Sequence, residues 1–489
     1  MINFLKTYPL YDKYNFKFVW LWKEYPYHDS NDRPDTGVDI IALTEEGDYW
    51  AVQCKFVGPN DYVNSDGINS FFRASGQLIK TERGERKFFS YRLLISTSYR
   101  WSSTAENSLE NQSIECFKLS LLDLEKASVD WLKLDQGLFG REARLKQYAL
   151  KDHQKAALEA ARNHYQSHDR GSLIMACGTG KTYASLKIVE DLTKSKGLVI
   201  FFAPSIALVG QTLKEWTAQA SETSALYPLC VCSDKSVSKY KKDDNDIDST
   251  SIADLSVPVT TNTKAILKEL KKEKYKDRLE VIFSTYQSIE PLAEALCQYG
   301  REVDLIVYDE AHRTTGAKLP NLEKAQGYDE SYFVKVHDNN FIKASKRLYM
   351  TATPRVYHEN AKDKAKSLGG SIILFSMDDA DHYGEEFYHL GFGEAVAKDL
   401  LSDYKVLVLT INRQSFSEAQ QEKLADGKKE ITSDDLTKLL GCHNALSKNF
   451  AYEGKVLRDV DPGPMRKAVT FCQSITKSKL ISEAFNNLN

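Results

Sequence analysis

The feature that most constrains this chain is a glycine-rich segment that follows an apolar run, LIMACGTGKTYAS at residues 173–185. Small residues lead to Lys181 and Thr182, which open a helix-compatible stretch. Gly178 and Gly180 allow successive backbone N–H groups to converge on phosphate oxygens. Lys181 can then reach the terminal phosphates, and the Thr182 hydroxyl can coordinate magnesium. The pattern predicts a phosphate-binding loop that includes Thr179.

This loop departs from the usual G-x-x-x-x-G-K-[ST] spacing, because Met175 stands where the first glycine is expected. A glycine turn before a helix that binds no nucleotide is therefore the alternative. The segment VDLIVYDEAHRTTG, residues 303–316, favours the nucleotide site, because its apolar run ends in Asp309 and Glu310. Ligands of open α/β sheets bind at the carboxyl ends of the strands. Asp309 is predicted to hold magnesium, largely through water, and Glu310 to polarise the water that attacks the γ-phosphate.

Length and composition limit the architectures that are possible. With 489 residues, 42% of them hydrophobic, the chain exceeds one ordinary domain. The net charge of −3 neither demands nor excludes a polyanionic partner. The N-terminus has no apolar signal region, and the longest near-apolar run, 197–210, suits a buried strand, so we expect a cytoplasmic protein without membrane contact. Eight cysteines without a C-x-x-C pair support neither a zinc site nor a disulfide framework.

Two strand-like segments near the N-terminus, VDIIAL (38–43) and DYWAVQCKF (48–56), flank a short turn and predict a β-hairpin. Counting across the turn places Asp39 within a residue of Gln53, and Gln53 shares one strand face with Lys55. An acid, an amide oxygen and an ammonium on one surface suit a metal-dependent phosphodiesterase. Asp39 and Gln53 would hold magnesium, and Lys55 would orient the attacking water. A surface hairpin with an ordinary lysine and aspartate is the alternative.

A helix is predicted over residues 14–25, ahead of this hairpin, from aromatic and apolar residues at helical spacing. The sequences WLWKEYPYHDSNDRPDTGVDIIA and AVQCKF resemble the Mrr-like branch of the PD-(D/E)xK nucleases, in which glutamine can replace the acid before x-K. The resemblance places Glu24 where some members carry an additional metal-binding acid. An exposed carboxylate at a helix end is the alternative for Glu24.

The segments around the phosphate-binding loop resemble, in order, the motifs of superfamily 2 DEAH-type helicases. The resemblance implies that Gln154 reads adenine. It also implies contacts to the DNA backbone by residues that follow two buried strands: Pro204, Ser205, Gln211, Thr285 and Gln287. A further group would link the nucleotide state to lobe movement: His312, Thr351, Ala352 and Thr353.

The fold class that we expect is α/β, with a small PD-(D/E)xK nuclease domain at 1–132 and a charged linker at 133–150. A RecA-like parallel-sheet ATPase lobe would follow at 151–375. A connector and an incomplete second RecA-like lobe would occupy 376–489. Within the first lobe, residues 241–263 are polar and low in aromatic residues, which predicts an insertion or mobile loop.

The second lobe of such a motor supplies arginine side chains to the γ-phosphate, a contribution on the order of 10³ to 10⁵ in rate. The residues after Phe471 leave no room for those motifs. We therefore expect a truncated motor that binds ATP and hydrolyses it weakly by itself.

The order of nuclease, linker and DEAH motor, and above all the sequences at 20–56 and 375–411, resemble the N-terminal part of type ISP restriction-modification enzymes. In that family a methyltransferase and a target-recognition domain follow the motor. The resemblance implies an endonuclease coupled to a double-stranded DNA translocase, with ATP and magnesium as cofactors. The missing motor lobe, methyltransferase and recognition domain would be supplied in cis or in trans. The alternatives are a helicase-nuclease subunit of another defence or repair complex, and a non-catalytic DNA- or nucleotide-binding remnant.

Overall fold

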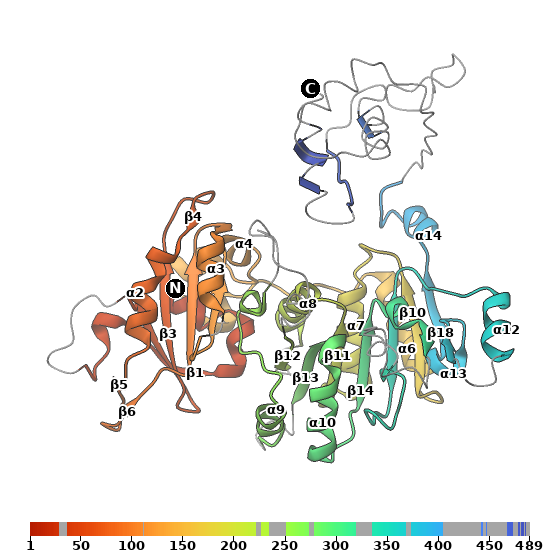
Figure 1. Cartoon of the computed structure of the whole chain (residues 1–489), viewed down its shortest axis with the longest axis horizontal. Helices are drawn as coiled ribbons and strands as arrows, with labels where there is room; N and C mark the ends of the chain where they lie inside the picture. Colours follow the sequence, from red (N-terminus) through yellow and green to blue (C-terminus); the bar gives the residue numbers. More distant parts are fainter. Residues whose placement is uncertain are drawn as a thin grey trace. The chain divides into compact units, whose positions relative to one another are not determined.

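The computed structural model describes residues 1–28, 37–110, 112–221, 226–233, 251–272, 278–318, 335–367 and 373–403, with a few isolated positions after them. The chain divides into two compact units, Met1–Ser402 and Asp403–Asn489. The first unit contains a five-stranded and a seven-stranded sheet (Figure 1). Most of residues 404–489, where we expect the incomplete second lobe, fall outside the described residues. No helix in the described ranges is long and apolar enough to span a membrane.

The five-stranded sheet of the N-terminal domain has the order β1-β2-β3-β7-β9. Its antiparallel part is formed by β1 (Phe16–Leu21), β2 (Ile40–Thr44) and β3 (Tyr49–Lys55). Two further strands, β7 (Tyr91–Ser96) and β9 (Cys116–Leu119), run parallel to β3. The predicted hairpin of β2 and β3 is therefore present.

Each face of this sheet packs against its own helices, because alternate side chains of a strand point to opposite faces. Ile41 and Ala51 pack in one apolar cluster with α2 (Ser65–Ser75) and α3 (Ser103–Leu109). Trp50, on the other face, belongs to a second cluster. That cluster includes residues of α1 (Ile2–Leu5), α4 (Leu121–Glu125) and α5 (Trp131–Asp135). Three short strand pairs complete the small elements of the unit: β4 (Tyr62–Val63) with β8 (Arg100–Trp101), β5 (Ile79–Lys80) with β6 (Arg86–Lys87), and β15 (Gly316–Lys318) with β17 (Ile373–Phe375).

The helix predicted over 14–25 is wrong. The chain forms 3₁₀ turns at Pro9–Tyr14 and Trp22–Glu24, with β1 between them. Aromatic and β-branched residues suit a pleated surface. Hydrogen bonding to β2, which the helical spacing does not reveal, favours a strand over a helix here.

The seven-stranded sheet is wholly parallel, with the order β12-β13-β11-β14-β16-β10-β18. Its strands are β10 (Arg170–Met175), β11 (Gly197–Ala203), β12 (Leu226–Val231), β13 (Leu279–Thr285), β14 (Leu305–Asp309), β16 (Arg347–Thr351) and β18 (Glu385–Leu390). Helices cover both faces, which explains why the inner strands read as nearly continuous apolar runs.

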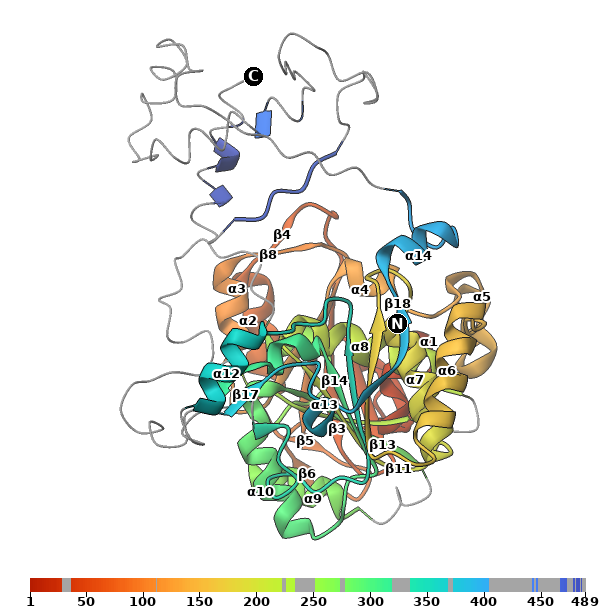
Figure 2. The same cartoon turned by 90° about the vertical axis from the view of Figure 1, so that its right-hand side faces the viewer.

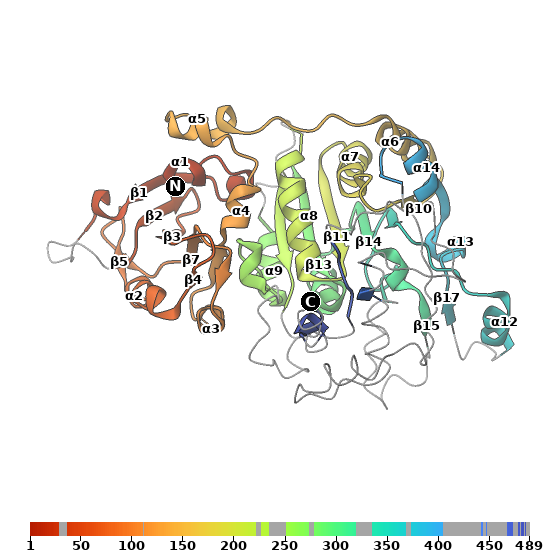
Figure 3. The ribbon, with the colours of Figure 1, turned by 90° about the horizontal axis from the view of Figure 1, so that it is seen from above.

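Helices α6 (Asp152–His164), α7 (Lys181–Thr193) and α8 (Ile206–Gln219) contribute to the cluster on one face and lie side by side in Figure 3. Helices α9 (Thr263–Leu270) and α10 (Ile289–Tyr299) cover the other face (Figure 2). Three more helices occur towards the end of the first unit: α12 (Glu359–Ser367), α13 (Ala380–Tyr383) and α14 (Phe392–Ala397).

The boundary predicted between residues 375 and 376 is wrong, because it would divide this sheet. Strand β18 hydrogen-bonds in parallel to β10, with Leu173 opposite Tyr388. Two segments more than 200 positions apart therefore form neighbouring strands. The parallel-sheet lobe continues at least through β18, within a unit that ends at Ser402.

The predicted linker at 133–150 is also largely packed. The Arg144 side chain donates a hydrogen bond to the Thr7 carbonyl at 2.8 Å, within the N-terminal domain. The Tyr148 N–H donates to the Gln219 side chain at 2.7 Å, at the end of α8. The first part of this segment therefore belongs to the N-terminal domain and the last part to the parallel-sheet lobe.

The segment predicted as an insertion at 241–263 is described from residue 251 onward, and this part is docked on the N-terminal domain. It contains a 3₁₀ turn at Ile252–Leu255. Leu255 is fully buried in the same apolar cluster as Trp50 and Phe117 of the five-stranded sheet. Polar composition alone could not reveal this contact.

Two lysines form ion pairs between the N-terminal domain and the parallel-sheet lobe. Lys118 of β9 is buried, and its ammonium lies 2.6 Å from Glu106 and 3.0 Å from Asp254, one carboxylate from each side. Lys214 of α8 pairs with Asp123 of α4 at 2.6 Å. A buried charge that loses its partner costs about 3–5 kcal/mol, so the ion pairs of the buried Lys118 favour one fixed arrangement.

Candidate active sites

The glycine-rich loop connects β10 to α7, as the sequence predicts. Met175 ends β10 and is fully buried, so the position of the missing first glycine lies in a strand. Gly178 and Gly180 have φ angles of +83° and +82°, which side-chain-bearing residues rarely adopt. A Cβ at Gly180 would lie 2.4 Å from Nε2 of Gln154. Lys181 then opens α7, whose N-terminal N–H groups favour an anion.

The two threonines of the loop have different surroundings. Thr179 is buried, and its hydroxyl donates to the Ala176 carbonyl at 2.7 Å, which stabilises the turn. Thr182 lies in the first turn of α7, and its carbonyl accepts a hydrogen bond from the Trp216 indole at 3.0 Å. The first helical turn is thus anchored to α8.

Lys181 meets both acids of the DEAH segment. Its Nζ lies 3.3 Å from Oδ1 of Asp309 and 3.4 Å from Oε1 of Glu310. The side chains of Lys181 and Asp309 are only 11% and 8% exposed. The sheet order explains the encounter, because only β16 separates β14 from β10. The sequence predicts these three residues, and the structure brings them together.

The two carboxylates differ electrostatically. Burial raises the pKa of Asp309 above its ordinary value, although the charge of Lys181 opposes the shift. A hydrogen bond with His312 lowers the pKa of Glu310 to about 2, and the charge of Lys181 acts in the same direction. Glu310 is therefore an anion throughout the neutral range.

The backbone of Glu310 is strained, a feature that sequence reasoning missed. Its φ is +51°, in the left-handed region that is uncommon for a residue with a side chain. Its N–H donates to Oδ1 of Asp309 at 3.0 Å. Tyr286 is buried and donates to the Asp309 carbonyl at 2.8 Å. These contacts hold the strand end in a conformation that presents both acids to Lys181.

A polar chain leads from this site to the end of β16. His312 Nδ1 lies 3.3 Å from Oε2 of Glu310 and 2.9 Å from Oγ1 of Thr351. The Thr351 hydroxyl also accepts from the Thr353 N–H at 3.1 Å, with Ala352 between them. The four residues predicted to couple nucleotide state to movement therefore lie in one connected group.

Gln154 lies against the glycine-rich loop and is 5% exposed. Its Oε1 accepts from the Lys151 N–H at 3.0 Å. Its Nε2 donates to the Gly180 carbonyl at 3.3 Å. The amide is thus fully engaged within the protein, so reading adenine would require it to exchange these partners.

The residues predicted to contact DNA divide into two groups. Ser205, Gln211 and Gln287 are exposed, near the starts of the segments that follow β11 and β13. Pro204 and Thr285 are buried, and the Thr285 hydroxyl bonds that of Ser288 at 3.2 Å. The buried pair shapes the strand ends, and the exposed three remain available to a ligand.

The predicted nuclease residues meet at one end of the hairpin. Ile40 pairs with Val52, which places Asp39 opposite Gln53 as predicted. The carboxylate of Asp39 is exposed and accepts from the Cys54 N–H at 2.7 Å. Gln53 and Lys55 share the sheet face that α2 covers, since a Cβ on Gly67 of α2 would lie 3.9 Å from Lys55.

The surroundings of the Gln53 side chain suit a bound cation at this site. Its side chain is buried, and its Nε2 donates to the Gly37 carbonyl at 2.8 Å, which fixes the orientation of the amide. Its Oε1 is buried without a hydrogen-bond partner among the described residues. An unsatisfied buried acceptor costs about 1–3 kcal/mol. A cation bound between this oxygen and Asp39 would remove that cost, so the residues present fit a magnesium ion.

Two neighbours of this site have different properties. Glu24 is exposed at the end of the Trp22–Glu24 turn rather than on a regular helix. The Trp22 N–H donates to the Asp39 carbonyl at 2.8 Å, so this turn adjoins the site. Burial, with the nearby charge of Asp39, raises the pKa of Cys54 to about 11. The Cys54 thiol therefore stays protonated and supplies neither a nucleophile nor a thiolate ligand.

One buried histidine behind the DEAH segment gives a pH prediction. Burial lowers the pKa of His337 from 6.5 to about 3. The unfolded chain therefore binds a proton that the folded chain excludes, and the free energy of unfolding falls below about pH 6.5, by at most about 1.4 kcal/mol per pH unit. When the pH falls from about 7 to about 5, we expect the melting temperature of the His337→Phe variant to fall less than that of the unmodified chain. His358→Phe is the control, because His358 is exposed, and its melting temperature should fall as much as that of the unmodified chain. An equal fall in all three proteins would contradict a lowered pKa for His337.

Comparisons with known proteins agree with this geometry. Residues 6–138 match the family described as "Restriction endonuclease", and residues 147–356 match "Type III restriction enzyme, res subunit". Among solved structures, the ATP-dependent type ISP restriction-modification enzyme LlaBIII bound to DNA is 33% identical with a TM-score of 0.74. That match covers 99% of this chain and 30% of LlaBIII.

Two curated relatives are more distant. The type I restriction enzyme EcoAI endonuclease subunit of Escherichia coli is 22% identical over 346 residues, which covers 68% of this chain and 33% of that protein. The probable helicase A859L of African swine fever virus is 27% identical over 222 residues, covering 45% of this chain and 21% of the viral protein. This chain spans a third or less of each relative. It combines a restriction endonuclease domain with a RecA-like helicase-type ATPase lobe, and it resembles part of a type ISP restriction-modification enzyme.

Proposed function

We propose that this chain is the nuclease and motor part of an ATP-dependent restriction system, in which a double-stranded DNA translocase is coupled to a magnesium-dependent endonuclease. The observation that carries the proposal is the contact of Lys181 with both Asp309 and Glu310 at the carboxyl edge of a parallel sheet. A loop lysine and two strand-end acids at this place suit phosphoryl transfer. DNA binding by LlaBIII supports DNA as the substrate. A restriction role on DNA would place the chain in the cytoplasm.

In the ATP site, Lys181 would leave the two carboxylates and bind the terminal phosphates. Thr182 and Asp309 would hold magnesium, which neutralises charge on the phosphates. Glu310 would orient the attacking water, and its anionic state suits that task. The His312 contact with Glu310 and Thr351 would report nucleotide state to the end of β16.

In the nuclease site, Asp39 and the buried Oε1 of Gln53 would hold magnesium, which would act there as a Lewis acid. Lys55 would orient the attacking water and offset negative charge as the phosphodiester is cut. Glu24 would join only as an additional ligand from the neighbouring turn.

DNA would run along the carboxyl edge of the parallel sheet, where Ser205, Gln211 and Gln287 are exposed. We place the nuclease domain at residues 1–144 and the first motor lobe at 151–402. A second motor lobe, a methyltransferase and a recognition domain, in cis or in trans, would complete the system.

The test uses the full chain after metal removal. Fluorescent ATP should bind saturably when magnesium is added, and supercoiled plasmid should be nicked only with magnesium. Calcium in place of magnesium should support binding without nicking, because it is a weaker Lewis acid that keeps a looser coordination sphere. A chain that binds no nucleotide in magnesium would contradict the motor, and nicking that survives chelation would contradict the nuclease.

A further inference from the structure

Two loops meet at the carboxyl edge of the nuclease sheet, directly after Lys55. Strands β3 and β7 are parallel, and Lys55 pairs with Ser96 at their ends. The Thr97 N–H donates to the Lys55 carbonyl at 3.1 Å. The Thr97 hydroxyl accepts from the Val57 N–H at 2.9 Å and donates to the Val57 carbonyl at 2.7 Å. The residue between Lys55 and Val57, which is Phe56, is therefore held between two fixed neighbours.

The same two loops are joined again further on. The Tyr99 N–H donates to the Pro59 carbonyl at 3.0 Å. Beyond it, β4 and β8 form a short parallel pair in which Tyr62 lies opposite Arg100. The Tyr99 hydroxyl donates to Glu125 at 2.6 Å, which orients its ring. The loops thus form a rigid edge rather than two independent surface turns.

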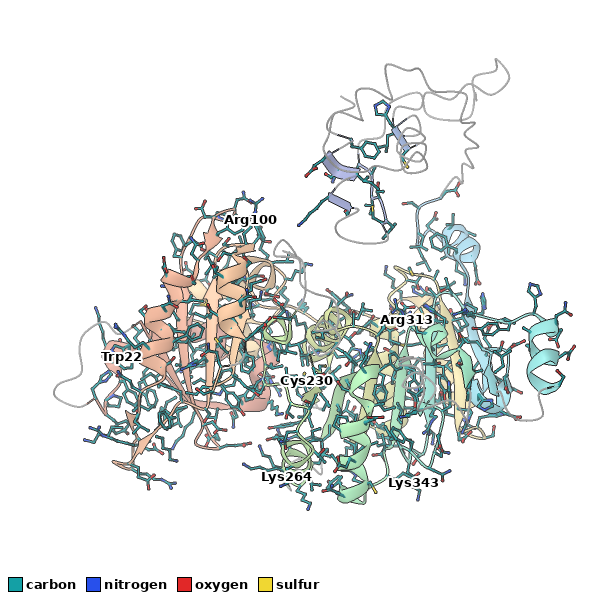
Figure 4. The ribbon with its side chains drawn as sticks, viewed as in Figure 1. Trp22, Arg100, Cys230, Lys264, Arg313 and Lys343 are labelled. Carbon is teal, nitrogen blue, oxygen red and sulfur yellow. The ribbon has the colours of Figure 1, made fainter. Side chains whose placement is uncertain are left out.

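This edge presents an aromatic and basic surface, which we call the aromatic rim: Phe56, Tyr62, Tyr99 and Arg100. Phe56 is 93% exposed, and Tyr62 and Tyr99 are 43% and 44% exposed. The Arg100 guanidinium lies 5.6 Å from the centre of the Tyr62 ring. Figure 4 shows Arg100 at the end of the nuclease domain where Figure 1 labels β4.

A single exposed apolar residue needs no explanation, since such residues are common on protein surfaces. The rim differs in two respects. One of its rings, that of Tyr62, lies beside the Arg100 guanidinium, and the backbone of the loops that carry the rim is hydrogen-bonded to the Lys55 carbonyl through Thr97. Aromatic rings next to arginine are a recurring means of holding nucleic acid strands, because rings stack on bases that are not stacked within a duplex and guanidinium groups bind phosphates.

We propose that the aromatic rim is the DNA-holding surface of the nuclease domain. Arg100 binds a backbone phosphate, and Phe56 stacks against a base or sugar next to the phosphodiester at Asp39, Gln53 and Lys55. Tyr62 orients Arg100 through the cation–π contact. This inference rests on the proposed nuclease function and names the surface by which that site would take its substrate.

The kinetic test compares Phe56→Ala and Arg100→Ala with Phe88→Ala in the full chain. Phe88 is a matched control, because it is 58% exposed in the same domain and is not part of the rim. We expect the two rim variants to raise the KM for plasmid nicking by roughly tenfold, with kcat changed by less than about twofold. Phe88→Ala should match the unmodified chain. An unchanged KM in both rim variants would overturn the proposal.

A second measurement does not depend on cleavage. A photoreactive benzoylphenylalanine replaces Phe56 in an Asp39→Ala chain, which is illuminated with duplex DNA, and the same replacement at Phe88 is the control. We expect several-fold more crosslinking from position 56. Equal crosslinking at both positions would overturn the proposal that the rim holds DNA. Strong crosslinking at position 56 combined with no nicking by the unmodified chain would support the rim and contradict only the nuclease function.

Discussion

Lys181→Ala is expected to lower the affinity for magnesium and ATP by about 10² to 10³, and to stop any DNA-stimulated hydrolysis. Lys181 is the cation that faces both Asp309 and Glu310, at 3.3 and 3.4 Å. Without it, two buried or half-buried acids would face the incoming phosphates uncompensated. A loss of about 10² to 10³ in affinity corresponds to about 3–4 kcal/mol, which lies within the cost of about 3–5 kcal/mol for removing one partner of a buried ion pair.

The measurement is saturation binding of a fluorescent ATP analogue, with circular dichroism to confirm folding. Lys155→Ala is the control, because Lys155 lies on α6 with a side chain that is 62% exposed and pairs with a solvent-exposed Asp152. Its nucleotide affinity should not change. Undiminished ATP affinity in a folded Lys181→Ala chain would remove the nucleotide site from this loop.

Asp39→Ala should reduce magnesium-dependent nicking to background, and Lys55→Ala should reduce it by about 10² to 10³. Asp39 supplies the carboxylate of the site, and the Gln53 oxygen beside it carries no charge to replace it. Lys55 acts on the transition state, so its loss should lower kcat more than magnesium affinity. The two variants therefore separate ion binding from chemistry.

Nicking of supercoiled plasmid across a magnesium titration makes this distinction. Asp39→Ala should shift the magnesium dependence, whereas Lys55→Ala should lower the plateau at the same magnesium midpoint. Glu45→Gln is the control, because Glu45 is an exposed acid in the turn of the same hairpin. Nicking that persists unchanged in both Asp39→Ala and Lys55→Ala would exclude this hairpin as the nuclease site.

Much of both sites could be predicted from the sequence, because each depends on contiguous residues. The glycine-rich loop and its lysine occupy five successive positions, and the hairpin register follows from a short turn. Within such stretches, backbone geometry leaves few arrangements. The structure brings Lys181 into contact with Asp309 and Glu310, and places Asp39 opposite Gln53.

Predictions failed where a long-range partner decided the outcome. Residues 14–25 have helical spacing, yet β1 forms because β2 supplies a neighbouring strand. The end of the first lobe is set by the pairing of β18 with β10. The polar stretch that ends at residue 263 is docked because Asp254 meets the buried Lys118 of β9.

The sequence by itself predicted the chemistry that we propose for this chain: which residues would cradle phosphate, hold magnesium and orient water, and the order of the two domains. Only the tertiary structure decided how that chemistry is held. It set the left-handed backbone of Glu310, buried the Gln53 oxygen without a hydrogen-bond partner among the described residues, and joined the two loops of the rim next to Lys55. The physical reason is that motifs are local in the chain, whereas burial, strain and charge pairing depend on residues that only folding brings together.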